Sequence, residues 1–227
     1  MSTNASNTEH SCIHCAATKE LPPAPPLDSL IENDITKIIV LDFDGVLNPL
    51  SAGTLGKKYF PTDHAAVVGN PHHANNPSVE PPAYTVKWST GLVGELNGIL
   101  SGSDAVVVWL TTWKQYAGTL AAMMGLAPNT AQLFLGFGAP GVTHPPQGDK
   151  KPALENWLDT SSLFAGKLPQ PGAGVKIAWV DDDVLQVSYA GAVKHKYNGC
   201  LLTIAPNSMK GLSVYKMGML GRFMGAL

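Results

Sequence analysis

Short apolar runs alternate with segments of helical periodicity along most of this chain. The first run extends from Ile38 to Leu41, and Phe43 follows it after a single polar residue. A run that is apolar at every position predicts a strand covered on both faces, as in parallel sheets. Comparable runs predict further strands over residues 105–110, 132–137, 175–180 and 201–205.

Apolar residues at helical spacing occupy the segments between these runs. They predict helices over residues 89–100, 113–126, 152–158 and 212–224. Pro152 falls in the first turn of its helix, where a missing amide hydrogen is tolerated. Strands that alternate with helices indicate an α/β fold with a parallel sheet and right-handed crossovers.

The N-terminal segment does not follow this alternation. Residues 1–36 are polar at first and then rich in proline, so we expect a disordered tail before a domain that spans residues 37–227. The tail contains Cys12, His14 and Cys15. Zinc binding is an alternative for this cluster, but a structural zinc site normally draws its ligands from two separated pairs.

Residues 50–87 form a second irregular segment, which is rich in Pro, Gly, Asn and His. This segment is too long for a simple connection, so we predict a functional or partly mobile insertion over the strand ends, without a clear core of its own. Its histidines, His64, His72 and His73, are expected to be solvated loop residues, with metal or substrate binding as the alternative.

The composition limits the class of protein. The chain has 227 residues, enough for one decorated domain, and its hydrophobic content of 44% is ordinary for a globular protein. The formal net charge is -2, and Arg222 is the only arginine among 15 basic residues, so nothing favours nucleic acid as an obligatory partner. No segment has the roughly 18 uninterrupted apolar residues of a membrane span, and the N-terminus lacks a signal-peptide pattern. We therefore expect a cytoplasmic protein with no obligatory protein partner.

Polar side chains gather where the predicted strands end. Asp42 and Asp44 follow the first strand, and their i, i+2 spacing directs both side chains the same way from an extended backbone. The other candidates follow two later strands or begin a helix: Thr111 or Thr112, Lys150 or Lys151, and Asp181 with Asp182. The carboxyl ends of parallel strands meet at one edge of the sheet, where ligands bind in open α/β folds. We therefore expect a site at this edge.

These residue types suit phosphoryl transfer. Two carboxylates about 4 Å apart repel each other by about 4 kcal/mol at an effective dielectric constant near 20, so a cation must offset them. Mg²⁺ suits a site shared by carboxylates, waters and a phosphate. One carboxylate would act as a nucleophile and a second would transfer protons, while a hydroxyl and an ammonium would bind the phosphoryl oxygens.

The order of the motifs DFDGVLNP, WLTT, KK and WVDDD resembles the haloacid dehalogenase (HAD) superfamily of phosphohydrolases, over residues 37–206. The tryptophans of WLTTW and WVDDD, with Pro206 and Gly211-Leu212, resemble its branch linked to Swiss Army Knife RNA repair proteins. The resemblance implies a Rossmann-like three-layer sandwich with a central parallel sheet and a small cap or flap insertion after the first strand. It also implies Mg²⁺-dependent hydrolysis of a phosphate monoester through an aspartyl-phosphate intermediate.

The resemblance gives the candidate residues their roles. Asp42 would be the nucleophile, and Asp44 would protonate the leaving oxygen and then activate the hydrolytic water. Thr111, with Thr112 as the reserve, would bind the phosphoryl group.

The lysine and the metal ligands complete the implied site. Lys150 is preferred to Lys151 for binding the phosphoryl group, although both lie at a helix start. Asp183 receives no role. The implied Mg²⁺ ligands are the nucleophile, the backbone carbonyl of the second acid and two later acids: Asp42, Asp44, Asp181 and Asp182.

The implied substrate is a phosphorylated small molecule or a phosphorylated nucleic-acid end. Two alternatives stay open. The first is a phosphotransferase or mutase that passes the phosphoryl group to a hydroxyl instead of water. The second is a phosphate-binding module without turnover, against which the presence of both Asp42 and Asp44 speaks.

Overall fold

The computed structural model describes residues 36–51, 58–70, 78, 83–113, 116–126, 132–134, 150–160, 175–183 and 200–227. Five strands form one parallel sheet in the order β5-β4-β1-β6-β7. They are β1 (Lys37–Leu41), β4 (Val106–Trp109), β5 (Gln132–Phe134), β6 (Lys176–Val180) and β7 (Leu201–Ile204). The strand that precedes the first acidic motif is therefore the central one.

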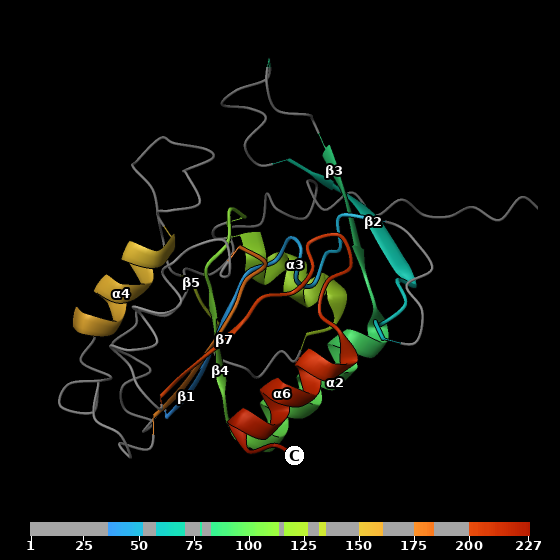
Figure 1. Ribbon diagram of the computed structural model, residues 1–227. Coiled ribbons are helices and arrows are strands. Elements are labelled where there is room, and N and C mark those ends of the chain that lie inside the picture. Colours follow the sequence, from blue (N-terminus) through green and yellow to red (C-terminus); the bar gives the residue numbers. More distant parts are fainter. Residues whose placement is uncertain are drawn as a thin grey trace, which may run out of the picture.

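Helices cover both faces of this sheet (Figure 1). The helices α2 (Thr90–Ser103), α3 (Ala117–Met124) and α6 (Val214–Met224) lie on one face, and α4 (Lys150–Thr160) lies on the other. In β1, Ile39 and Leu41 belong to the apolar cluster that includes the three helices, whereas Ile38 and Val40 belong to the cluster with Leu154 of α4. Burial on both faces explains the unbroken apolar run and confirms the predicted α/β three-layer sandwich.

The four predicted helices are present, with shifted ends. Helix α2 begins after Ser89, whose hydroxyl accepts a hydrogen bond from the Leu92 amide at 3.3 Å. Helix α3 begins at Ala117 rather than at Trp113, because Trp113 belongs to the turn that follows β4. Helix α4 begins at Lys150, before Pro152, so its first residue lies at the polar edge of the sheet.

The insertion contains a β-hairpin that the sequence did not predict. The strands β2 (His64–Gly69) and β3 (Ala83–Trp88) pair antiparallel in a separate two-stranded sheet. The expectation of an irregular segment over residues 50–87 was therefore wrong for these two stretches. The buried side chains of the hairpin, Val68, Val86 and Trp88, join the main apolar cluster. The hairpin thus packs on the sandwich as a flap without a core of its own.

Several expectations fall on residues outside the described ranges. These include the tail up to residue 35, with Cys12, His14 and Cys15, and the pair His72 and His73. The division into a tail and a domain stays a prediction. In the part of the chain that is described, no helix is long and apolar enough to cross a membrane.

Candidate active site

The register of the central sheet brings two acidic residues together. Leu41 of β1 pairs with Val180 of β6, so the residues that follow, Asp42 and Asp181, leave adjacent strands side by side. The Asp42 amide donates to the Val180 carbonyl at 3.0 Å, and the Asp181 amide donates to the Ile204 carbonyl at 3.0 Å. These hydrogen bonds extend the ladders beyond the strands and fix both backbones at the carboxyl edge.

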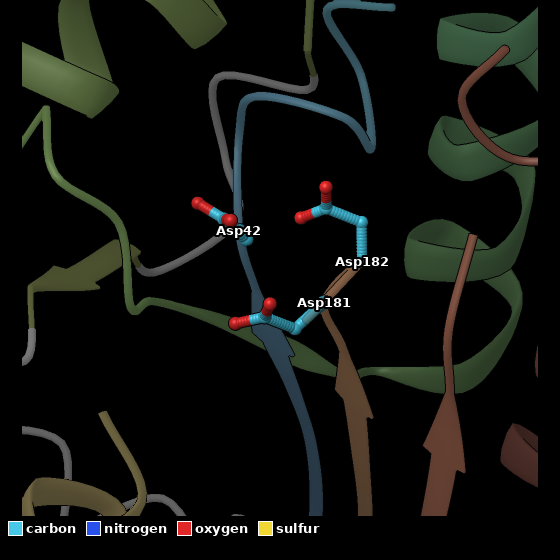
Figure 2. Close-up of side chains that lie close together, drawn as sticks. All are labelled: Asp42, Asp181 and Asp182. Carbon is cyan, nitrogen blue, oxygen red and sulfur yellow. The ribbon is translucent and has the colours of Figure 1, made fainter. Parts of the chain in front are cut away.

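Three carboxylates converge at this edge (Figure 2). One oxygen each from Asp42, Asp181 and Asp182 lies within 4.8 Å of the others; Asp42 and Asp181 are buried and Asp182 is half-buried. Gly45 makes room for this arrangement. Its φ is +71°, and a Cβ atom built there would lie 2.4 Å from Asp182 Oδ2. A glycine is therefore required at this turn for two reasons, the backbone conformation and the close approach of Asp182.

Lys150 contacts two of these carboxylates. Its Nζ donates to Asp42 Oδ2 at 2.7 Å and to Asp181 Oδ2 at 3.0 Å. The other oxygen of each carboxylate accepts a hydrogen bond from a backbone amide. The Phe43 amide donates to Asp42 Oδ1 at 2.7 Å, and the Asp183 amide donates to Asp181 Oδ1 at 3.0 Å. Because α4 begins at Lys150, its side chain enters the site from the first residue of that helix.

The neighbouring Lys151 lies elsewhere on α4. Its Nζ is 3.8 Å from Glu155 Oε1, one helical turn further on, and both side chains are partly exposed. The structure thus separates the two lysines that the sequence left as alternatives, and brings only Lys150 into contact with the buried acids among the described residues.

The charges of this cluster do not balance. Burial raises the pKa of Asp42 to about 7; Lys150 opposes the rise and Asp181 adds to it. Burial also raises the pKa of Asp182 to about 6, with further contributions from Asp183 and Asp181. Although burial alone would lower it, the pKa of Lys150 lies above its usual range because Asp42 and Asp181 attract the proton. Among the residues that the structure describes, one ammonium lies beside three carboxylates, so the oxygen donors fit a hard divalent cation.

Asp44 has different partners. Its Oδ1 accepts a hydrogen bond from Asn48 Nδ2 at 2.6 Å, and its Oδ2 accepts one from Trp113 Nε1 at 2.9 Å. Burial raises the pKa of Asp44, and these two hydrogen bonds oppose the rise. Its carboxylate does not belong to the three-acid cluster, and the metal contact expected through its backbone carbonyl stays a prediction.

A pocket of about 260 Å³ opens beside Asp44. Three segments line it: the turn after β1, strand β3 of the hairpin and the turn after β4. The lining residues are Asp44, Asn48, Pro49, Leu50, Tyr84, Thr85, Lys87, Thr112 and Trp113. The hairpin therefore forms one wall of a space that reaches the second acid of the first motif.

The two threonines after β4 differ in exposure. Thr111 is fully buried, and its Oγ1 accepts a hydrogen bond from the Trp113 amide at 3.5 Å. Thr112 is half-buried and lines the pocket. The phosphoryl-binding role assigned to Thr111, with Thr112 as the reserve, stays a prediction.

Other side chains that the sequence singled out lie outside the acidic cluster. His64 is exposed in β2, where its Nδ1 lies 3.0 Å from Asp63 Oδ1. The backbone amide of Asp183 donates a hydrogen bond to Asp181 Oδ1.

Two residues near Asp44 received no role from the sequence. Asn48 and Trp113 both stand within the motifs DFDGVLNP and WLTTW, so position in a motif was the available signal. Their function as partners of Asp44 became visible only from the contacts.

Comparison with known proteins supports the assignment of these motifs. The family model described as "HAD domain in Swiss Army Knife RNA repair proteins" matches residues 38–216, which contain all the candidate residues from Asp42 to Asp182. No curated protein and no solved structure matches the chain significantly.

Proposed function

The chain belongs to the family of HAD domains found in Swiss Army Knife RNA repair proteins, and we propose that it is a metal-dependent phosphatase that hydrolyses a phosphate monoester through an aspartyl-phosphate. The observation that carries the proposal is the buried cluster in which Lys150 contacts both Asp42 and Asp181. The family supports phosphoryl-transfer chemistry in general; the hydrolase activity, the intermediate and the residue roles are our proposal.

In the first half-reaction, a carboxylate oxygen of Asp42 attacks the phosphorus. The new bond joins Asp42 to phosphorus while the bond from phosphorus to the leaving oxygen breaks. Asp44 gives its proton to that oxygen, as its position at the pocket allows. Lys150 stays charged because of its carboxylate neighbours and offsets charge on the phosphoryl oxygens.

In the second half-reaction, Asp44 accepts a proton from a water molecule that attacks the phosphorus. The bond to Asp42 breaks, and inorganic phosphate leaves. A divalent cation held by Asp42, Asp181 and Asp182 would supply further stabilisation of the negative charge that develops on the phosphoryl group. We propose Mg²⁺, because carboxylates and phosphate oxygens are its preferred ligands.

The pocket beside Asp44 would hold the leaving group. It has aromatic walls from Tyr84 and Trp113 and a cationic residue, Lys87, which suit a phosphorylated nucleic-acid end. The RNA repair branch of the family supports the same substrate class. A phosphorylated small molecule is the alternative, because the pocket is only about 260 Å³.

The test is phosphate release from p-nitrophenyl phosphate and from 5′- and 3′-phosphorylated oligonucleotides. We expect turnover with Mg²⁺, none with excess chelator, and no recovery with Ca²⁺, which takes more ligands at longer distances. Asp42→Asn should remove turnover and keep the fold, whereas the control Asp104→Asn, at an exposed helix end, should keep both. Full activity in excess chelator, or a tenth of wild-type activity in Asp42→Asn, would contradict the proposal.

A further inference from the structure

Both oxygens of the Asp44 carboxylate are held by side chains outside the acidic cluster. Asn48 donates to Oδ1 at 2.6 Å and Trp113 donates to Oδ2 at 2.9 Å. One donor would leave the carboxylate able to rotate about its last torsion, whereas two donors on different oxygens fix the plane of the group. Asn48 and Trp113 are themselves buried, 7% and 6% exposed, so water competes little for these hydrogen bonds.

Strand β3 holds both donors. The Lys87 amide donates to Asn48 Oδ1 at 2.9 Å, which fixes the side-chain amide with its nitrogen toward Asp44. The Trp113 ring packs edge to face against Phe43 at 5.9 Å and against Tyr84 of β3 at 5.6 Å. Two separate paths therefore lead from the hairpin to the same carboxylate.

We propose that Asn48 and Trp113 are positioning residues, which the hairpin strand β3 holds in place so that Asp44 faces the leaving oxygen. The proposal rests on the proposed function, in which Asp44 exchanges a proton with that oxygen. It gives the insertion a second task besides lining the pocket: the hairpin fixes the proton donor. Trp113 has both tasks, since it lines the pocket and donates to Asp44.

A positioning role can be distinguished from a structural role by how strongly the loss of activity in a variant depends on the leaving group of the substrate. General acid catalysis contributes typically about 10²–10⁴-fold, and a poor leaving group needs it more than a good one. Phenyl phosphate and p-nitrophenyl phosphate have nearly the same shape, but phenol is a far weaker acid than p-nitrophenol. The value of kcat/KM reports the steps up to departure of the leaving group, so it is the quantity to compare between the two esters.

The main variant is Trp113→Phe, which keeps an aromatic ring and removes the donor. We expect kcat/KM to fall by roughly ten-fold for phenyl phosphate and by less than about three-fold for p-nitrophenyl phosphate. Asn48→Ala removes the other donor and tests the same point independently. The matched control is Trp157→Phe, which replaces a buried tryptophan of α4 in the opposite apolar cluster. This substitution should change kcat/KM by the same factor for both esters.

The outcomes separate this inference from the proposed function. If the wild type releases phosphate from neither ester, both are overturned. If the wild type is active and depends on Asp42, but Trp113→Phe and Asn48→Ala slow the two esters equally or not at all, the positioning role alone is overturned. Asp44→Asn is the variant for comparison. It removes the proton donor itself, so it should lower kcat/KM for phenyl phosphate, relative to p-nitrophenyl phosphate, even more than Trp113→Phe does.

Discussion

Replacing Lys150 with methionine removes the ammonium that contacts the buried carboxylates of Asp42 and Asp181. Methionine keeps much of the length and apolar stem of lysine, so the loss is mainly electrostatic. At 2.7 and 3.0 Å, each contact corresponds to about 6 kcal/mol of attraction at an effective dielectric constant near 20, before the cost of dehydrating the charges. Removing one partner of a buried ion pair typically costs about 3–5 kcal/mol. We expect a loss of this size in unfolding free energy at pH 8 without metal.

The loss should be smaller at pH 5. The pKa of Asp42 is about 7 in the folded protein, raised from 3.8, so this carboxyl is largely protonated at pH 5 and Lys150 then faces one charged partner fewer. Removing Lys150 raises the pKa of Asp42 further. The variant therefore regains stability relative to the wild type as the pH falls from its own raised Asp42 pKa towards the wild-type value of about 7.

Urea unfolding in excess chelator at pH 5 and pH 8 measures both effects. Lys151→Met is the matched control, because its pair with Glu155 is partly exposed and should contribute only about 0.3–0.5 kcal/mol. If Lys150→Met cost no more than Lys151→Met at pH 8, the two buried contacts would not stabilise the protein and the reasoning would be refuted. Equal losses at both pH values would refute the part that concerns Asp42.

Two further predictions concern the turn at Gly45 and the start of α2. Gly125→Ala should cost about 1–2 kcal/mol of unfolding free energy because its φ is positive. Gly45→Ala should cost more, because its φ is also positive and its Cβ would meet Asp182, and only Gly45→Ala should weaken Mg²⁺ binding in calorimetry. The second prediction concerns Asp63, which accepts hydrogen bonds from Thr90 at the start of α2. Burial raises the pKa of Asp63, but the hydrogen bonds from Thr90 outweigh this and lower the pKa to about 2. Asp63→Ala should therefore cost about 1 kcal/mol of unfolding free energy near neutral pH. That cost should shrink as the pH falls from 3.8 towards 2 in urea unfolding; a constant cost would contradict it.

The fold and the positions of the acidic residues could be predicted because both follow from strand order and alternation. A strand such as β1, apolar on both faces, must be internal, and the acids that follow it must lie at the carboxyl edge. The choice between Lys150 and Lys151 could not be made this way. Successive residues of a helix point about 100° apart, so the answer depends on where α4 begins, and its apolar pattern begins after both lysines.

The hairpin and the hydrogen-bond partners of Asp44 could not be predicted from the sequence, for different reasons. In β2 only Val68 is buried, so the strand lacks the alternation that reveals a half-buried strand. The contacts of Asn48 with Lys87 and of Trp113 with Asp44 join residues 39 and 69 positions apart. No local pattern records such contacts, even though both residues stand inside recognisable motifs.

The two acids of the first motif show how environment separates chemically identical groups. Their spacing suggested parallel side chains, but β1 ends at Leu41 and the chain bends before Gly45, so the two carboxylates have different neighbours. Asp42 lies against Lys150 and another carboxylate, where a charged oxygen can be held for attack. Asp44 accepts hydrogen bonds from two neutral donors at the pocket, where the proposed proton exchange with a leaving group would take place. In the proposed mechanism, therefore, the nucleophile and the proton carrier differ only in what the sheet edge and the hairpin place around them.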